Sequence, residues 1–98
     1  MESRRGGGGY VRIIKLNVRE DDLLKSIIDE IGDSISAFSA LNYINRLYDD
    51  KVVNLKEYYM LEAAMNPKNI PLREPYSSIV RASLLKGMLA ALLKVKEE

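Results

Sequence analysis

The sequence predicts a mainly α-helical fold with one N-terminal β-strand and a C-terminal helical extension, paired with a second copy as an intertwined dimer. Three observations predict it. Hydrophobic residues alternate with period two over residues 10–18, and the pattern then changes to the helical period. No second strand is predicted in residues 19–98, since Lys51-Val52-Val53 is too short. The 98 residues, 47% of them hydrophobic, are enough to build one core.

Residues 1–9 are predicted to form a flexible basic arm. Arg4 and Arg5 precede four consecutive glycines, Gly6 to Gly9, which lose much conformational entropy when they become ordered. The arm is either a solvated tail or a segment that follows DNA phosphates or enters the minor groove.

Residues 10–18 are predicted to form a half-buried strand, because its two faces differ. Ile14, Leu16 and Val18 share one face of the strand. A lone strand cannot satisfy its own backbone N–H and C=O groups, so we expect it to pair with the same strand of a second copy. This gives a homodimer with an antiparallel two-stranded ribbon. The alternative is an edge strand that docks on the sheet of another protein.

Four amphipathic helices are expected after the strand. The first ends at Gly32, and Asp33 to Ser36 offers the N-cap of the second. The third begins with a capping box at Asn54 and stops before Pro67, and Ser77 or Ser78 is expected to cap the last. The apolar stripes that define the first two helices consist of Leu23, Leu24, Ile27, Ile28 and Ile31, and of Phe38, Leu41, Ile44, Leu47 and Tyr48.

The last helix, Ile79 to Lys96, is apolar over more than one face. Such a wide arc is either core or a surface shared with another chain. Within residues 79–95 we therefore expect a possible protein-partner or oligomer surface at Leu85, Leu89 and Leu92. Residues 51–98 as a whole are expected to form a helical hairpin for assembly or partner binding.

The net charge of +1 hides an uneven distribution. Residues 1–18 carry four basic residues and one acidic residue, whereas residues 19–50 carry three basic and eight acidic residues. A basic front end therefore precedes an acidic middle, and local positive charge is what a DNA-binding segment needs.

Composition argues against catalysis and metal binding. The chain has no His and no Cys, which removes the usual general base, nucleophile pairs and thiolate zinc sites. We therefore expect no enzyme, no catalytic residue, no cofactor and no metal. Neither a signal peptide nor a membrane span is evident, so a cytoplasmic protein is expected. Absence of Cys and Gln with 30% charged residues favours a hyperthermophilic, archaeal source.

The order of motifs in residues 10–50 carries a family resemblance. An alternating strand, Val11 to Val18, is followed by a helix ending in Glu30-Ile31-Gly32 and by the helix start Asp33-Ser34-Ile35-Ser36. This order resembles the ribbon-helix-helix superfamily, to which the Arc and MetJ repressors belong. Proteins of that superfamily dimerise through the strand and insert the ribbon into the DNA major groove.

The resemblance implies roles for individual residues. Base contacts are expected from the outward strand face, Ile13, Lys15 and Asn17. Backbone contacts are expected from Arg4, Arg5, Arg12, Ser34 and Ser36. For Ser34 and Ser36, helix capping is the simpler role, and it is compatible with a phosphate contact. The implied dimer core consists of Ile14, Leu16, Val18, Phe38 and Leu41.

The function that follows is sequence-specific binding of double-stranded DNA by a homodimeric transcriptional regulator. The alternative is a non-catalytic accessory subunit that docks its strand and its last helix onto a larger protein complex.

Overall fold

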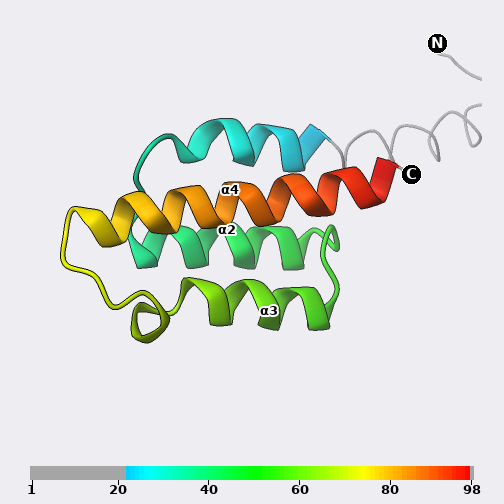
Figure 1. Cartoon of the computed structure of the whole chain (residues 1–98). Helices are drawn as coiled ribbons and strands as arrows, with labels where there is room; N and C mark the ends of the chain where they lie inside the picture. The colour runs from blue at the N-terminus through cyan, green and yellow to red at the C-terminus, as the bar shows by residue number, and fades with distance from the viewer. Residues whose placement is uncertain (1–21, 98) are drawn as a thin grey trace, which may run out of the picture.

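The computed structural model describes residues 22–97, and within this range the chain consists of helices joined by short loops (Figure 1). One helix covers residues 22–31. It is followed by α2 (Ala37–Asp49), α3 (Leu55–Met65), the short 3-10 helix η1 (Pro67–Asn69) and α4 (Tyr76–Glu97). No strand is present among residues 22–97, which confirms the mainly helical character. The predicted arm (residues 1–9) and strand (residues 10–18) lie outside the described residues.

The helices form a bundle in which consecutive helices run in opposite directions (Figure 1). α2 packs against both α3 and α4, and α4 also contacts α3. The 22–31 helix lies along the other side of α4. Its N-terminal end meets the C-terminal end of α4, where Lys25 Nζ lies 3.5 Å from Glu97 Oε2. The segment before residue 22 therefore joins the bundle at the end where α4 finishes.

Local signals set the helix boundaries as the sequence predicts. Gly32 has φ 71°, the left-handed conformation that ends the 22–31 helix. The Ser36 hydroxyl caps α2 by accepting a hydrogen bond from the Ser39 N–H at 3.1 Å. At α3, Asn54 and Glu57 form the predicted capping box, with each side chain accepting from the backbone N–H of the other at 2.8 Å.

The start of α4 differs from the prediction. The helix begins at Tyr76, before either serine that was expected to cap it. The hydroxyls of Ser77 and Ser78 instead donate to the carboxylate of Glu74. Because Glu74 also accepts from the Ser78 N–H at 3.1 Å, an acidic side chain takes the place of a serine cap.

A single buried cluster joins the four α-helices. Residues on both sides of the expected boundary at residue 50 belong to it, so the described parts of the predicted 10–50 module and 51–98 hairpin share one core. Its members are Leu24, Ile27, Ile31, Ile35, Ala40, Ile44, Leu47, Val52, Val53, Leu61, Met65, Ala82, Leu85 and Leu89.

One prediction about apolar side chains needs correction. Leu85 and Leu89 were expected on a partner surface, but both are fully buried in the chain's own core, on the side of α4 that faces the other helices. Phe38, expected on the apolar stripe of α2 and in the dimer core, is 75% exposed in the single chain. Periodicity identifies an apolar helix face but does not say which part of that face the neighbouring helices cover.

Candidate functional site

Most residues expected to contact DNA, and the expected strand part of the dimer core, lie outside the described residues. They are Arg4, Arg5, Arg12, Ile13, Ile14, Lys15, Leu16, Asn17 and Val18. Ser34 and Ser36 are described and exposed. The Ser36 hydroxyl accepts from the Ser39 N–H and donates to the Ser39 hydroxyl at 3.1 Å, so it acts as a helix cap.

The candidate site within the described residues is an uncovered apolar face on α4. It consists of Val80, Leu84, Ala91 and Val95, which we call the α4 apolar face. Val80 is 41% exposed, Leu84 is 40% exposed and Val95 is 67% exposed, and Ala91 is exposed as well. Their positions at i, i+4, i+11 and i+15 place all four on one side of the helix.

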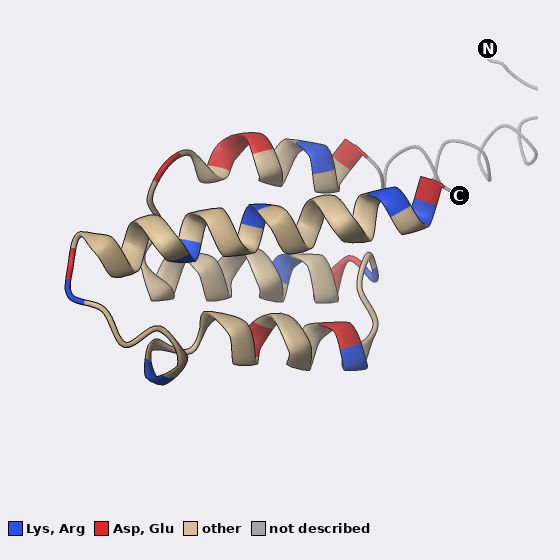
Figure 2. Ribbon diagram, in the orientation of Figure 1, with Lys and Arg blue, Asp and Glu red and all other residues tan. Residues whose placement is uncertain are grey.

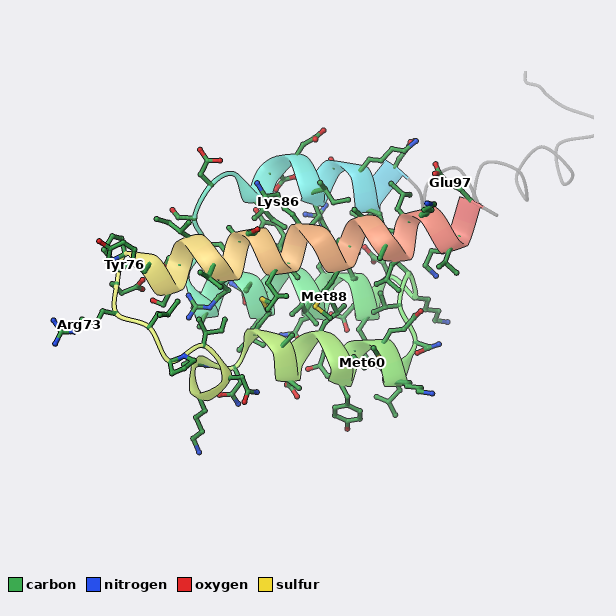
Figure 3. All side chains as sticks on the ribbon, in the orientation of Figure 1. Met60, Arg73, Tyr76, Lys86, Met88 and Glu97 are labelled. Atoms are coloured by element: carbon green, nitrogen blue, oxygen red, sulfur yellow. The ribbon has the colours of Figure 1, made fainter. Side chains whose placement is uncertain are left out.

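A groove between α3 and α4 continues this face. It has a volume of about 270 Å³ and is lined by Met60, Leu61, Met88, Ala91, Leu92, Val95 and one charged residue, Glu57. Figure 3 places Met88 on the side of α4 toward α3. Met60 of α3 is 56% exposed at this groove. Leu92, the third residue expected on a partner surface, is partly buried and lines the groove.

Charge is scarce along this part of α4. No charged residue occurs between Lys86 and Lys94 (Figure 2). Lys86 itself projects from the opposite side of α4, toward the 22–31 helix (Figure 3). Apolar side chains that stay exposed without interspersed charges are typical of a surface that another molecule covers.

Two tyrosine hydroxyls form hydrogen bonds that connect α2 to the neighbouring helices. The Tyr43 hydroxyl donates to Glu30 Oε1 at 3.2 Å, and the Tyr58 hydroxyl of α3 donates to Asn45 Oδ1 at 2.9 Å. Desolvation, followed by the nearby carboxylates, raises the pKa of both tyrosines above the usual value. These tyrosines stay neutral donors and hold α2 in register with the 22–31 helix and with α3. Leu41, expected in the dimer core, is partly buried against the same cluster.

Two other kinds of site are not seen in the described part of the chain. Among residues 22–97, no three acidic side chains gather in a way that could hold a metal ion. None of the helices described there is long and apolar enough to cross a membrane.

Comparison with known proteins identifies related sequences. Residues 19–90 match the family model described as the CtsR C-terminal dimerization domain. The transcriptional regulator CtsR of Lactiplantibacillus plantarum is 37% identical over 91 residues, which cover 91% of this chain and 59% of the relative. The Bacillus subtilis protein of the same name is 36% identical over 93 residues, covering 94% of this chain and 60% of the relative. No solved structure matches the chain.

The matches cover only part of the relatives. This chain spans about three-fifths of the length of these regulators, including the CtsR of Geobacillus stearothermophilus, of which 61% is covered at 37% identity. The matched family model spans most of the described residues and is named for dimerization.

These findings overturn the resemblance to the ribbon-helix-helix superfamily. The family model that matches is a different one, and it extends through residue 90 rather than ending near residue 50. In the structure, α3 and α4 share one core with the two helices before them. The expected spacing of a strand and two helices is therefore also compatible with another architecture. The relatives are regulators and not enzymes, which confirms that expectation.

None of the four residues of the α4 apolar face was predicted to lie on a partner surface. The signal was the wide apolar arc of the last helix, because one helix side cannot bury apolar residues over so large an angle. Leu85 and Leu92 each directly follow a residue of the α4 apolar face, and one residue corresponds to a rotation of about 100° around a helix. The predicted surface was therefore rotated away from the exposed side.

Proposed function

The chain belongs to the CtsR family of transcriptional regulators, and on this premise we propose that it is the self-associating part of a homodimeric regulator of transcription that binds double-stranded DNA. The observation that carries the proposal is the α4 apolar face with its adjoining groove, which no described part of the chain covers. Covering this face with a second copy removes exposed apolar surface from water, and this stabilises the pair.

Pairing supports DNA binding through symmetry. A homodimer with a two-fold axis presents the same contact twice, and this matches two half-sites of a palindromic duplex. Each copy contributes part of the binding free energy, so a monomer binds the same duplex more weakly.

The proposed DNA contacts lie in the basic N-terminal segment. Residues 1–18 carry a net charge of +3, and Arg4, Arg5 and Arg12 are the proposed contacts to phosphates. The 22–31 helix carries Asp22, Asp29 and Glu30 and is unsuited to face a duplex (Figure 2). Base reading by Ile13, Lys15 and Asn17 depended on the ribbon-helix-helix arrangement, so this mechanism is not proposed.

Binding to a pool of random-sequence duplexes at two salt concentrations tests this proposal. We expect the 98-residue chain to bind, with an affinity that falls steeply as the salt concentration rises, because neutralised phosphates release counterions. Replacing Arg4, Arg5 and Arg12 by Ala is expected to weaken binding and to flatten the salt dependence. Replacing the exposed Lys56, Lys68 and Arg73 by Ala is the matched control, since it removes the same charge from the bundle. Equal losses in the two triple variants would contradict the assignment to the N-terminal segment.

A further inference from the structure

Gly87 occupies a position in α4 that the chain's own structure does not require to be glycine. It is exposed in the middle of a 22-residue helix, and a Cβ added there would meet no atom within 4 Å. Its φ is not in the left-handed region either. Glycine weakens a helix interior relative to alanine, and its usual compensation is close approach by another backbone. No described part of this chain makes that approach.

The α4 apolar face is arranged symmetrically about Gly87 and Met88. Val80 and Val95 lie at its two ends, and Leu84 and Ala91 lie between them at equal distances from the centre. The four positions are therefore spaced identically in both directions along the helix, with Leu84 and Ala91 exchanging places. Two copies laid antiparallel therefore place Val80 opposite Val95, and Leu84 opposite Ala91, at both halves of the contact.

From this symmetry we infer that α4 packs antiparallel against α4 of a second copy, with the two-fold axis passing beside Gly87 and Leu84 of each copy seated over Ala91 of the other. The inference rests on the self-association proposed above and assigns the surface and the register that produce it.

The groove between α3 and α4 fits this arrangement. Ala91, with its short side chain, lines this groove together with the larger Met60 and Val95. In the antiparallel pair a two-fold axis perpendicular to the helices brings the α3 sides of both copies together. Leu84, on that side of α4, then reaches the groove of the other copy. A large residue opposite a small one is the packing that helix pairs favour.

Charge also favours the antiparallel pair over a parallel one. Residues 87–93, at the centre of the contact, carry no charge, so self-pairing buries no like charges there. The antiparallel helix dipoles attract one another, whereas parallel dipoles repel. A parallel pair would place each residue opposite its own counterpart, so Leu84 would meet Leu84 and the groove at Ala91 would stay unfilled.

Site-specific cross-linking tests the register directly, because the chain has no cysteine. Single variants Val80→Cys and Val95→Cys are treated with a short bis-maleimide, separately and after mixing. We expect the mixture to give a cross-linked dimer and each variant alone to give little. Leu84→Cys mixed with Ala91→Cys is expected to behave in the same way. Efficient cross-linking of Val80→Cys to itself would overturn the antiparallel register.

Phe38→Cys is the matched control, because Phe38 is more exposed than Val80, Leu84 or Val95. It is expected to give no cross-linked dimer.

Sedimentation of the unmodified chain separates the proposed self-association from the proposed α4 packing. A monomer at all concentrations would refute self-association itself, whereas a dimer that cross-links through Phe38 would refute only the α4 packing. Circular dichroism of each variant checks that the helices are retained.

Discussion

Arg81 shows how one buried side chain joins two distant segments. It is 4% exposed, and its Nη1 donates to the Ile35 carbonyl at 3.0 Å, while the Ile35 N–H donates to the Ser78 carbonyl at 3.1 Å. The turn before α2 is thereby held against the first turns of α4. Sequence patterning could not reveal this contact of Arg81, since its partner lies 46 residues away.

Arg81→Ala is expected to lower the free energy of unfolding by about 1–3 kcal/mol, because it leaves the buried Ile35 carbonyl without its donor. Urea denaturation measures the change. Arg73→Ala is the matched control, since Arg73 extends away from the bundle (Figure 3). Its effect is expected to stay within about 0.5 kcal/mol. If Arg81→Ala and Arg73→Ala unfold at the same urea concentration, the hydrogen bond from Arg81 contributes nothing to the free energy of unfolding.

Glu74 gives the stability of the chain a dependence on pH. Hydrogen bonds from Ser77, and then from Ser78, lower the pKa of this carboxyl below its ordinary value of 4.5. A carboxyl whose pKa is lowered by folding stabilises the folded state above its unfolded pKa, and this contribution is lost as the pH falls through the folded pKa.

We therefore expect the chain to be more stable than Glu74→Gln at neutral pH, with the difference shrinking once the pH falls below the ordinary glutamate value. Urea unfolding of both proteins at a series of pH values checks this. Replacing the exposed Asp33 by Asn in parallel accounts for the general effect of removing one charge. A difference between the chain and Glu74→Gln that stays constant down to strongly acidic pH would contradict the role of the two serines.

At the scale of the elements, the helices were the part of the fold that local sequence specifies. Gly32, Ser36 and the Asn54–Glu57 box act within a few residues of their own positions, so they could be recognised before any tertiary contact was known. The start of α4 was misjudged because Glu74, which precedes a proline, takes the capping role from the serines.

The two sides of α4 could not be separated from sequence alone. Leu84 and Leu85 are adjacent and chemically identical, yet Leu84 is 40% exposed and Leu85 is fully buried. Which of them faces the core depends on where the other three helices lie, and that arrangement is a property of the whole bundle.

Gly87→Ala is expected to have opposite effects on folding and on association. Helix propensity predicts that it stabilises the isolated chain by up to about 1 kcal/mol, since the added methyl group meets no atom of the same chain. The same methyl group separates two helices that approach closely, so the dimer is expected to dissociate more readily. Urea unfolding at high dilution measures the first effect, and sedimentation measures the second. A variant that associates as tightly as the original chain would argue against close approach at Gly87.

At the scale of the whole molecule, the bundle explains why the family resemblance misled. Residues 10–50 do contain the spacing typical of a ribbon-helix-helix protein, and two of the expected helices exist. In a ribbon-helix-helix dimer, those two helices would bury their apolar faces against a second copy of the chain. Here Leu61, Met65, Leu85 and Leu89 from α3 and α4 complete it within one chain. Partners so distant in sequence leave no local pattern.

The proposed pairing also sets the distance between the two points at which the basic N-terminal segments join the bundle. Each basic N-terminal segment joins the bundle beside the Glu97 end of α4. In the antiparallel register these two ends are separated by about 29 Å along the helix axis, from the rise of 1.5 Å per residue. This separation is close to one turn of DNA, about 34 Å, which is the spacing at which dimeric regulators contact successive half-sites.

Sedimentation equilibrium of the chain, Leu84→Glu and Phe38→Glu tests most directly whether the α4 apolar face joins two copies. We predict that the chain and Phe38→Glu are dimers. Leu84→Glu is predicted to raise the dissociation constant at least about a hundredfold, because pairing would bury an uncompensated charge. Its helical circular dichroism is expected to be unchanged, since Leu84 is not part of the core. A Leu84→Glu variant that dimerises as tightly as the original chain, or a Phe38→Glu variant that is monomeric, would contradict this assignment.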